Sequence, residues 1–523
     1  MIIIGKNILE NLTTGMYSDS KVSYREYIQN ACDQIDKAVE MGLLKENEGY
    51  IDIFIDSSNR YISIKDNATG ISANEFKTEF GNIANSNKIQ GKDKGFRGIG
   101  RLCGLAYCKT LTFKTTFKGE NGLSIMTYDA EKMREMLRNN IKYTIEDILR
   151  EITSIKTEEI EADKHYFEVE LININNENID LLDINKIRKY LSFLAPVPYK
   201  NEFLFCNEIY KHAKEIGYKI DEYKILLNGE EILKDYTSKL KDQNGSSLKN
   251  YDDISKLEFE NFYDKNDELM AWMWIGLSRF EKSIPPVNEM RGLRLRQGNI
   301  QLGEDNCLQI LFKENRGNYY FVGEVFGVSK DLIPNSQRNY FNETETRVMF
   351  ENELRNYFHR TLHILYTGGN QIKNALKKQE NYLQKVKEFE DKNVNNKFIN
   401  KDEKYQLEME IKKAKSDSEN AKKTLSKFEK ISEISPLEEV RKQISKKFDQ
   451  EKLIEKTENT NLENIMKDNK VKKKGLNYAA DELSKLNKNE RKLVSKIWTI
   501  ITDFCPTKDL SEKIIEKIKE EFK

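Results

Sequence analysis

Three acidic or amide side chains near the start of the chain have the spacing of a site on one helix face. Glu26, Asn30 and Asp33 occupy positions i, i+4 and i+7 of the segment 24–37, so a helix there projects all three from one side. A carboxylate one turn from an amide oxygen can order water and a hard cation, and Mg²⁺ on phosphates needs only one or two protein ligands. The structural alternative is an amphipathic helix whose polar face is solvated.

A second group follows an alternating segment that predicts a strand. Asp66 ends this strand, and a tight turn containing Thr69 closes at Gly70. A carboxylate at a strand end can accept a hydrogen bond from an exocyclic amine such as that of adenine. The alternative is a strand followed by an Asx-type turn.

The third group is the glycine-rich stretch 91–104, with Gly95, Gly98 and Gly100 in a GxxGxG pattern that leads into a predicted helix. Such a loop can present backbone N–H groups and a helix N-terminus to phosphates. The stretch lacks the Gly-Lys-Ser/Thr of a Walker A loop, and it lies too far inside the chain for the first turn of a Rossmann fold.

Composition limits the classes of protein that could carry these groups. Lys plus Arg equal Asp plus Glu at 86 each, so net charge predicts neither nucleic acid nor membrane as a partner. The most apolar stretch, 270–277, is far shorter than the roughly 20 residues that cross a bilayer. Six cysteines without a CxxC pair and four histidines argue against a disulfide framework or a structural zinc site. We therefore expect a cytoplasmic protein that lacks a membrane partner.

The pair Gly368-Gly369 predicts an interruption of the regular structure. The part of the chain after it has almost no proline and is predicted to be helical. A weak heptad seam predicts either an antiparallel helical hairpin or an intermolecular coiled coil. The seam consists of Leu407, Ile411, Ala414, Ser418, Ala421, Leu425 and Phe428. A small helical unit follows, for which we expect a core of Leu493, Ile497, Ile500 and Phe504.

The order and spacing of the three groups resemble those of the GHKL (Bergerat-fold) ATPases. Among these, the chain is most similar to the ninety-kilodalton heat-shock chaperones and their prokaryotic and MORC-like relatives. Residues 25–37 resemble the first helix of that family, and residues 83–88 lie where it carries the entry to its lid. Residues 327–338 resemble the middle-domain loop whose arginine reaches the γ-phosphate, which implies that role for Arg338. The resemblance covers roughly residues 1–365.

The resemblance implies an α/β protein built from a Bergerat-fold α/β sandwich, an α/β transducer domain, an α-helical coiled-coil arm and a small helical domain. The corresponding boundaries are 1–178 for the ATP-binding domain, 179–366 for the transducer domain, 367–455 for the helical hairpin or coiled coil, and 456–523 for the linker and the last domain.

It also implies ATP and Mg²⁺ as cofactors. Glu26 would activate the attacking water, Arg338 would act from the transducer domain, and Asn30 would hold the metal. Arg294 and Arg296 are the alternative to Arg338, as charged groups at a strand edge. The implied nucleotide-binding residues are Asn30, Asp33, Asp66, Thr69, Gly70, Lys88, Gly95, Phe96, Arg97, Gly98, Ile99 and Gly100.

Two positions depart from the family pattern. Ala68 stands at the first glycine of Asp-x-Gly-x-Gly, and Lys164-His165-Tyr166-Phe167 stands where a Gly-Thr pair is expected. If Ala68 needs a positive φ it costs about 1 kcal/mol. Slow turnover or a weakened purine contact would follow.

The expected function is an Mg-dependent ATPase whose domain closure and homodimerisation work as a clamp or switch, in a bacterial anti-phage defence system. The alternatives are a chaperone-like ATPase acting on protein clients and a nucleotide-sensing module without turnover. A protein effector from the same operon and a nucleic acid are the further partners considered.

Overall fold

The chain forms two compact units, one of residues 1–278 and 282–363 and the other of residues 279–281 and 364–523. The predicted α/β fold class is confirmed, with an N-terminal region that contains a sheet, a second sheet and long C-terminal helices. The computed structural model describes residues 6–15, 19–81, 100–139, 141–394, 397–432, 436–448, 486–505 and 507–521.

The larger unit contains an eight-stranded sheet in the order β5-β4-β3-β6-β2-β1-β7-β8. Its neighbours are antiparallel except for β1 and β7, which pair in parallel. The sheet therefore includes two strands that lie beyond the boundary predicted at residue 178. Its strands are β1 (Tyr50–Asp56), β2 (Tyr61–Asp66), β3 (Cys108–Thr116), β4 (Gly122–Asp129), β5 (Thr153–Glu159), β6 (Tyr166–Ile174), β7 (Lys224–Leu227) and β8 (Glu230–Glu231).

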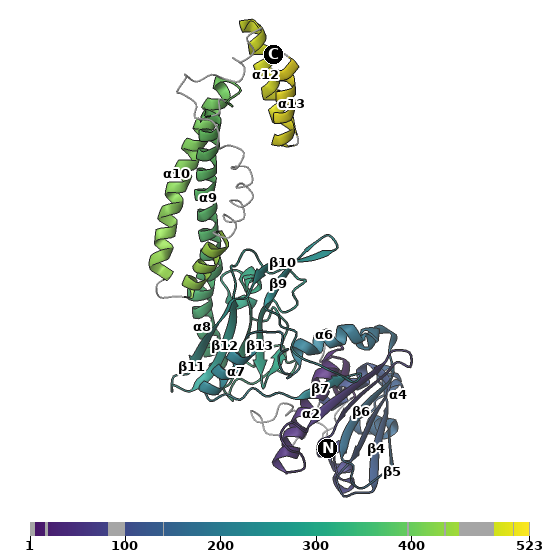
Figure 1. Ribbon diagram of the computed structural model, residues 1–523. Helices are drawn as coiled ribbons and strands as arrows, with labels where there is room; N and C mark the ends of the chain where they lie inside the picture. Colours follow the sequence, from purple (N-terminus) through teal and green to yellow (C-terminus); the bar gives the residue numbers. More distant parts are fainter. Residues whose placement is uncertain are drawn as a thin grey trace. The chain divides into compact units, whose positions relative to one another are not determined.

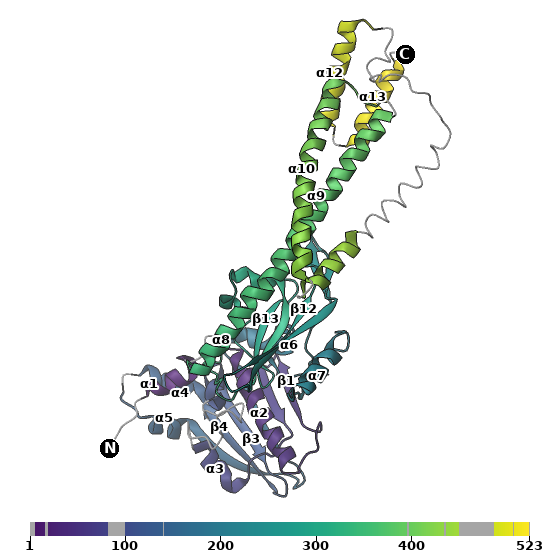
Figure 2. The same ribbon diagram turned by 90° about the vertical axis from the view of Figure 1, so that its left-hand side faces the viewer.

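The two faces of this sheet differ because successive side chains of a strand point to opposite sides. In β1, Ile51, Ile53 and Ile55 are buried in one continuous core with apolar residues of α2 (Val22–Glu40). Both ribbon views place α2 against the sheet (Figures 1 and 2). The opposite face carries polar pairs such as Tyr61 and Glu170, joined by a hydrogen bond of 2.7 Å.

The remaining described helices of this unit are mostly short segments that connect or cover the strands. They are α1 (Asn7–Glu10), η1 (Asn11–Gly15), α3 (Ala73–Gly81), η2 (Gly100–Ala106), α4 (Ala130–Arg138), α5 (Ile145–Ile152), η3 (Asn176–Leu182), α6 (Ile184–Leu194), α7 (Cys206–Glu215), η4 (Gln309–Leu311), η5 (Asn315–Tyr320), α8 (Glu345–Tyr357) and η6 (Phe358–Leu362).

A second sheet of the same unit has the order β11-β12-β15-β13-β14, with β13 and β15 parallel. Trp272 and Trp274 of β12 are both fully buried in one core cluster, as expected for two residues on one strand face. The strands are β11 (Lys256–Tyr263), β12 (Leu269–Leu277), β13 (Gly292–Gln297), β14 (Ile300–Leu302) and β15 (Val322–Gly327), beside the separate hairpin β9 (Lys239–Asn244) and β10 (Ser247–Asp253).

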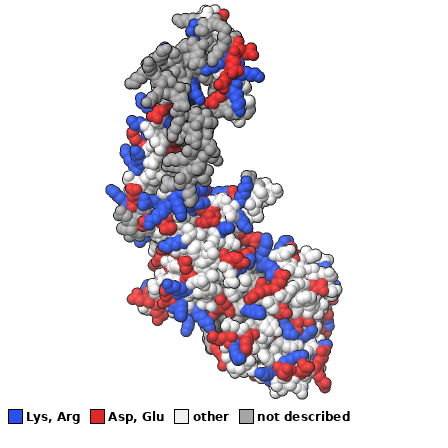
Figure 3. Space-filling view, in the orientation of Figure 1, with Lys and Arg blue, Asp and Glu red and all other residues white. Residues whose placement is uncertain are grey.

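Charges of both signs are interspersed over the larger unit in the space-filling view, in keeping with the balanced composition (Figure 3). None of the helices in the described part of the chain combines the length and the apolar character that crossing a bilayer requires.

The smaller unit is helical, with α9 (His363–Val394), α10 (Lys401–Ser432), a helix over 437–448, α12 (Lys488–Phe504) and α13 (Lys508–Glu521). Ion pairs join Lys385 to Glu410 and Lys392 to Glu403. As one partner advances along the chain the other recedes, so α9 and α10 are antiparallel within the chain. Five residues of the predicted heptad seam are buried, namely Leu407, Ala414, Ser418, Ala421 and Phe428.

Two expectations for this unit were wrong. Gly368 and Gly369 do not interrupt the chain; they lie inside α9, where other side chains pack within 3.5 Å of a Cβ position. The expected core of α12 is exposed, with Phe504 at 85% and Leu493 at 60%. Trp498 is buried instead, because side chains of α13 such as Ile515 pack against it. The helix has two neighbouring apolar stripes, and packing against α13 and against Ile399 and Leu486 selects between them.

Candidate functional site

The first group of predicted residues lies on α2 as its spacing indicated. Glu26 and Asp33 are buried and Asn30 is partly buried. Tyr27, on the core side of α2, fixes the helix against the start of η2. Its hydroxyl donates to the carbonyl of Arg101 at 3.1 Å and accepts from the N–H of Gly104 at 3.0 Å. The segment after the glycine-rich stretch is thus held against the helix that carries the acidic group.

Gly100 makes the closest approach to that acidic group. A Cβ atom on Gly100 would lie 2.1 Å from Oε2 of Glu26, a distance that real contacts do not allow. A side chain at position 100 would therefore displace the Glu26 carboxylate from the place where the backbone of η2 covers it. The other predicted residues of this region, Lys88, Gly95, Phe96, Arg97, Gly98 and Ile99, lie outside the residues that the structure describes.

The second group surrounds a buried carboxylate at the end of β2. Asp66 accepts a hydrogen bond from the N–H of Ala68 at 3.0 Å. Burial raises its pKa to about 7, although N–H donors from Ala68 and Phe167 lower it. Such a group gains from a further hydrogen-bond donor that favours its charged form. The exocyclic amine of a purine is a donor of this kind, so the Asp66 carboxylate is an acceptor that fits the predicted nucleotide.

The turn after Asp66 explains why Ala68 is tolerated. Ala68 does not have a positive φ. The cost of about 1 kcal/mol for alanine in that conformation therefore does not arise. Gly70 has φ of 64°, and a Cβ there would lie 1.9 Å from the carbonyl oxygen of Thr116. The hydroxyl of Thr69 donates to Gln34 on α2 at 2.9 Å.

The two departures from the family pattern contact each other. Nδ1 of His165 lies 2.6 Å from the carbonyl oxygen of Ala68. His165 belongs to the segment that stands in place of the expected Gly-Thr pair. The imidazole thus braces the turn that follows Asp66, a role that the sequence did not indicate.

Replacing Asp66 with Asn is expected to stabilise the nucleotide-free protein increasingly as pH rises. The raised pKa means that Asp66 contributes fully to stability only below about pH 4, and this contribution is lost as pH rises through 7. At pH 8 the neutral amide removes a penalty on the order of 4 kcal/mol. Melting temperatures at pH 5 and pH 8 measure the effect. A difference between variant and wild type that does not grow with pH would contradict it.

Arg338 lies on a loop of the second sheet region that approaches α2. Its Nε is 3.2 Å from Oε1 of Glu26, and both side chains are buried. Arg338 has φ of 53°, in the left-handed region that is unusual for a residue with a side chain. The N–H of Gly303, directly after β14, donates to the Arg338 carbonyl at 3.0 Å and helps to hold this conformation.

Arg25 is a site residue that the sequence did not identify. Its guanidinium donates to the carbonyl of Arg338 at 3.3 Å and to the carbonyl of Gln337 at 3.0 Å. Two neighbouring side chains of α2 therefore hold the same loop. Arg25 binds backbone carbonyls of the loop, and Glu26 binds the side chain of Arg338. Helical periodicity does not distinguish Arg25 from the other polar positions of α2. Its role becomes visible only from its contacts with the loop.

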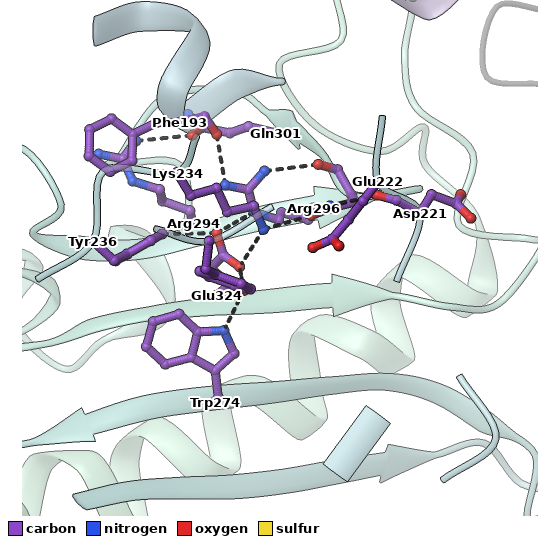
Figure 4. Close-up of polar contacts among 12 residues, drawn as sticks. Phe193, Asp221, Glu222, Lys234, Tyr236, Trp274, Arg294, Arg296, Gln301 and Glu324 are labelled. Atoms are coloured by element: carbon purple, nitrogen blue, oxygen red, sulfur yellow. Dashed lines mark hydrogen bonds and ion pairs between the residues drawn. The ribbon is translucent and has the colours of Figure 1, made fainter. Parts of the chain in front are cut away.

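A buried charge network lies behind this loop in the second sheet (Figure 4). Glu324 of β15 accepts from Arg296, from Lys234 at 3.1 Å and from the hydroxyls of Tyr236 at 2.9 Å and Tyr199. Burial alone would raise the pKa of Glu324, but Arg296 and Lys234 outweigh it and hold the pKa well below its usual value.

The expectation that Arg294 and Arg296 are charged groups at a strand edge was wrong. Both are buried on β13, which has a neighbour on each side in the sheet. Arg296 also donates to the carbonyl of Phe193 on α6 at 2.7 Å. The network therefore joins α6, which lies between β6 and β7 of the first sheet along the chain, to the second sheet, next to the Arg338 loop.

Replacing Glu324 with Gln is expected to lower the free energy of unfolding by about 3 kcal/mol, because two buried cations lose their counter-charge. Urea unfolding followed by tryptophan fluorescence measures the loss. Adding Lys234→Met should restore part of it by removing one unpaired cation. Glu268→Gln, at an exposed position, is the matched control. An equal loss in the control, or no rescue, would contradict the role of the network.

Among the described residues, no cluster of three or more His, Cys, Asp or Glu side chains is arranged to hold a metal ion.

Comparison with known proteins supports the prediction of an ATPase domain. Residues 17–166 match the family described as Histidine kinase-, DNA gyrase B-, and HSP90-like ATPase, which confirms the predicted GHKL-type ATPase domain. Chaperone protein HtpG of Buchnera aphidicola is 31% identical over 157 residues, which is 26% of this chain and 25% of that protein. Chaperone protein HtpG of Wigglesworthia glossinidia brevipalpis is 24% identical over 289 residues, 51% of this chain and 40% of that protein. The chain thus spans well under half the length of these relatives.

Proposed function

We propose that the protein hydrolyses ATP with Mg²⁺ and uses the reaction as a conformational switch. The observation that carries this proposal is the pairing of Arg338, from the second sheet region, with Glu26 of the ATPase domain. An arginine brought in from another region can stabilise the charge that develops on a transferring phosphoryl group. The ion pair brings together the carboxylate and the guanidinium that the proposed hydrolysis needs.

In this proposal Glu26 orients the attacking water and accepts its proton. Gly100 covers the carboxylate and limits its movement. Asn30, one turn along α2, supplies a neutral oxygen ligand, and bound Mg²⁺ neutralises charge on the phosphates. Asp66 accepts from the adenine amine, with Asp33, Thr69 and the turn at Gly70 beside it.

The switch follows from the ion pair itself. Arg338 contacts Glu26 through Nε, and in this proposal a bound γ-phosphate competes with Glu26 for the guanidinium and redirects it. Arg25 holds the backbone of the same loop. We therefore expect redirection of the Arg338 guanidinium to move the whole loop, not only one side chain. Closure of a homodimer on a polypeptide client is the proposed output, since the similar proteins are named chaperones.

Phosphate release tests the proposal directly. We expect turnover with Mg²⁺, loss of turnover in EDTA, and stimulation by an unfolded polypeptide. Stimulation by duplex DNA that falls steeply with salt would instead favour a nucleic-acid-associated clamp. Nucleotide binding without any phosphate release would favour the sensing module. The defence role and the operon effector remain predictions from the sequence.

Replacing Gly100 with Ala is expected to lower turnover about 100-fold, because the new methyl group displaces the Glu26 carboxylate and misplacement of about 1 Å has this effect. Gly122→Ala is the matched control, since a Cβ there meets only ordinary contact at 3.5 Å. Steady-state phosphate release measures both variants. Equal activity of Gly100→Ala and the control would show that the carboxylate position is not critical.

A further inference from the structure

A cavity of about 570 Å³ lies on the larger unit, away from Glu26 and Arg338. Its walls come from the C-terminal half of α2, the loop 46–49, Pro198, the segment 219–224 and β8. This volume falls within the range of small-molecule sites. None of the predicted nucleotide-binding residues that the structure describes lines it.

The lining combines many carboxylates with an apolar surface of similar extent. Only two cationic side chains are present, and one of them, Lys219, is already 3.5 Å from Glu46. Ile35, Val39 and Pro198 supply apolar surface. The carboxylates are Asp36, Glu40, Glu46, Asp221, Glu222 and Glu231.

Contacts within the chain fix the walls. The buried Tyr223 donates its hydroxyl to both carboxylate oxygens of Asp36, each at 2.8 Å, and so joins the segment 219–224 to α2. Gly49 packs so closely on Ile35 that a Cβ would lie 2.4 Å from Cγ2 of that side chain. The cavity is therefore a built feature rather than a gap between mobile loops.

Glu222 is the cavity carboxylate that a bound cation would stabilise most. Its carboxylate accepts from the hydroxyl of Tyr210 at 2.7 Å, and no ion pair of Glu222 exists among the residues described. Burial raises its pKa. In Figure 4 Glu222 and Asp221 lie next to each other beside Arg296 of the buried network. The charge of Lys234 and the Tyr210 hydrogen bond only partly offset this burial. A cation entering the cavity would add to the counter-charge of this carboxylate.

We propose that this cavity binds an aliphatic ammonium ligand, either a polyamine or the side chain of a lysine. The methylene chain would lie on Ile35, Val39 and Pro198, and the ammonium groups would reach the carboxylates around them. Several separated carboxylates favour a ligand with more than one charge. An anionic nucleotide is repelled by the same lining, so this site is independent of the proposed ATP site.

Calorimetric titration of the full chain with spermidine, and separately with Nα-acetyl-lysine amide, tests the proposal at 150 mM salt. We expect saturable binding of spermidine that weakens at least tenfold in Glu222→Gln and in Glu231→Lys. Glu231 is exposed, so that variant keeps the test valid if loss of the Tyr210 contact disturbs folding. Glu208→Gln and Glu208→Lys are matched controls at an exposed position of α7, outside the cavity.

Binding of spermidine alone assigns the site to a free polyamine, and binding of the lysine derivative as well assigns it to a peptide side chain. Absence of saturable heat with both ligands would overturn the proposal. So would equal weakening in the Glu208 controls, because that would mean general charge attraction. Each result is obtained without ATP, so failure here is separable from failure of the proposed hydrolysis.

Discussion

Replacement of Glu26 by Gln is expected to lower ATP turnover by roughly two to four orders of magnitude, the usual contribution of a general base. Gln has nearly the same shape, so the contact with Gly100 and the position of α2 are retained. What is lost is the ability to accept a proton from water. ATP affinity is expected to change by less than about threefold, because uniform binding does not depend on the base. Single-turnover phosphate release and calorimetric affinity measure the two quantities separately.

Glu135→Gln is the matched control for this variant, since Glu135 is exposed on α4. It should retain wild-type turnover. If Glu26→Gln hydrolyses ATP as fast as this control, the proton acceptor lies elsewhere and the assignment of Glu26 fails.

Replacement of Arg338 by Ala is expected to lower turnover by at least about a thousandfold, the lower end of the range for arginines that act on a transferring phosphoryl group. The variant should also lose the preference for ATP over ADP, because the lost guanidinium is the group proposed to detect the γ-phosphate. Arg338→Lys should recover only a small part, since an ammonium cannot reproduce the fork of donors that a guanidinium presents.

Arg316→Ala is the control for Arg338, as it removes an exposed arginine from the same unit. Comparing ATP and ADP affinities separates a role at the γ-phosphate from a structural role in the loop. A variant that loses turnover while its ATP-to-ADP preference is unchanged would indicate that Arg338 only supports the loop.

The parts of the site that depend on local periodicity were predictable from the sequence. A helix places Glu26, Asn30 and Asp33 on one side whatever surrounds it. A strand that ends in an acid and a glycine turn similarly located Asp66 and Gly70. The nucleotide roles of these residues remain predictions.

The parts that depend on long-range approach were not predictable from local patterns. Arg338 was reached only through resemblance to a family, and Arg25 was missed because its partners are carbonyl groups more than 300 positions away. The parallel pairing of β7 with β1 joins segments on either side of a predicted domain boundary.

The same limit explains the error in α12. Leu493 and Trp498 lie on adjacent apolar stripes of α12. The apolar periodicity of the helix does not indicate which of the two stripes is buried. The burial of Trp498 follows from α13, a partner that a helical pattern alone does not identify.

Isothermal titration of the full chain with ATP and Mg²⁺ is the most direct measurement of whether a nucleotide binds beside α2. We expect saturable heat with one site per chain. Affinity should fall at least tenfold in Asp66→Asn, because one carboxylate oxygen accepts from the N–H of Ala68 and the other becomes an NH2 group, which cannot accept from the adenine amine. A correctly folded protein that gives no heat of binding, or binds equally well in Asp66→Asn, would contradict it.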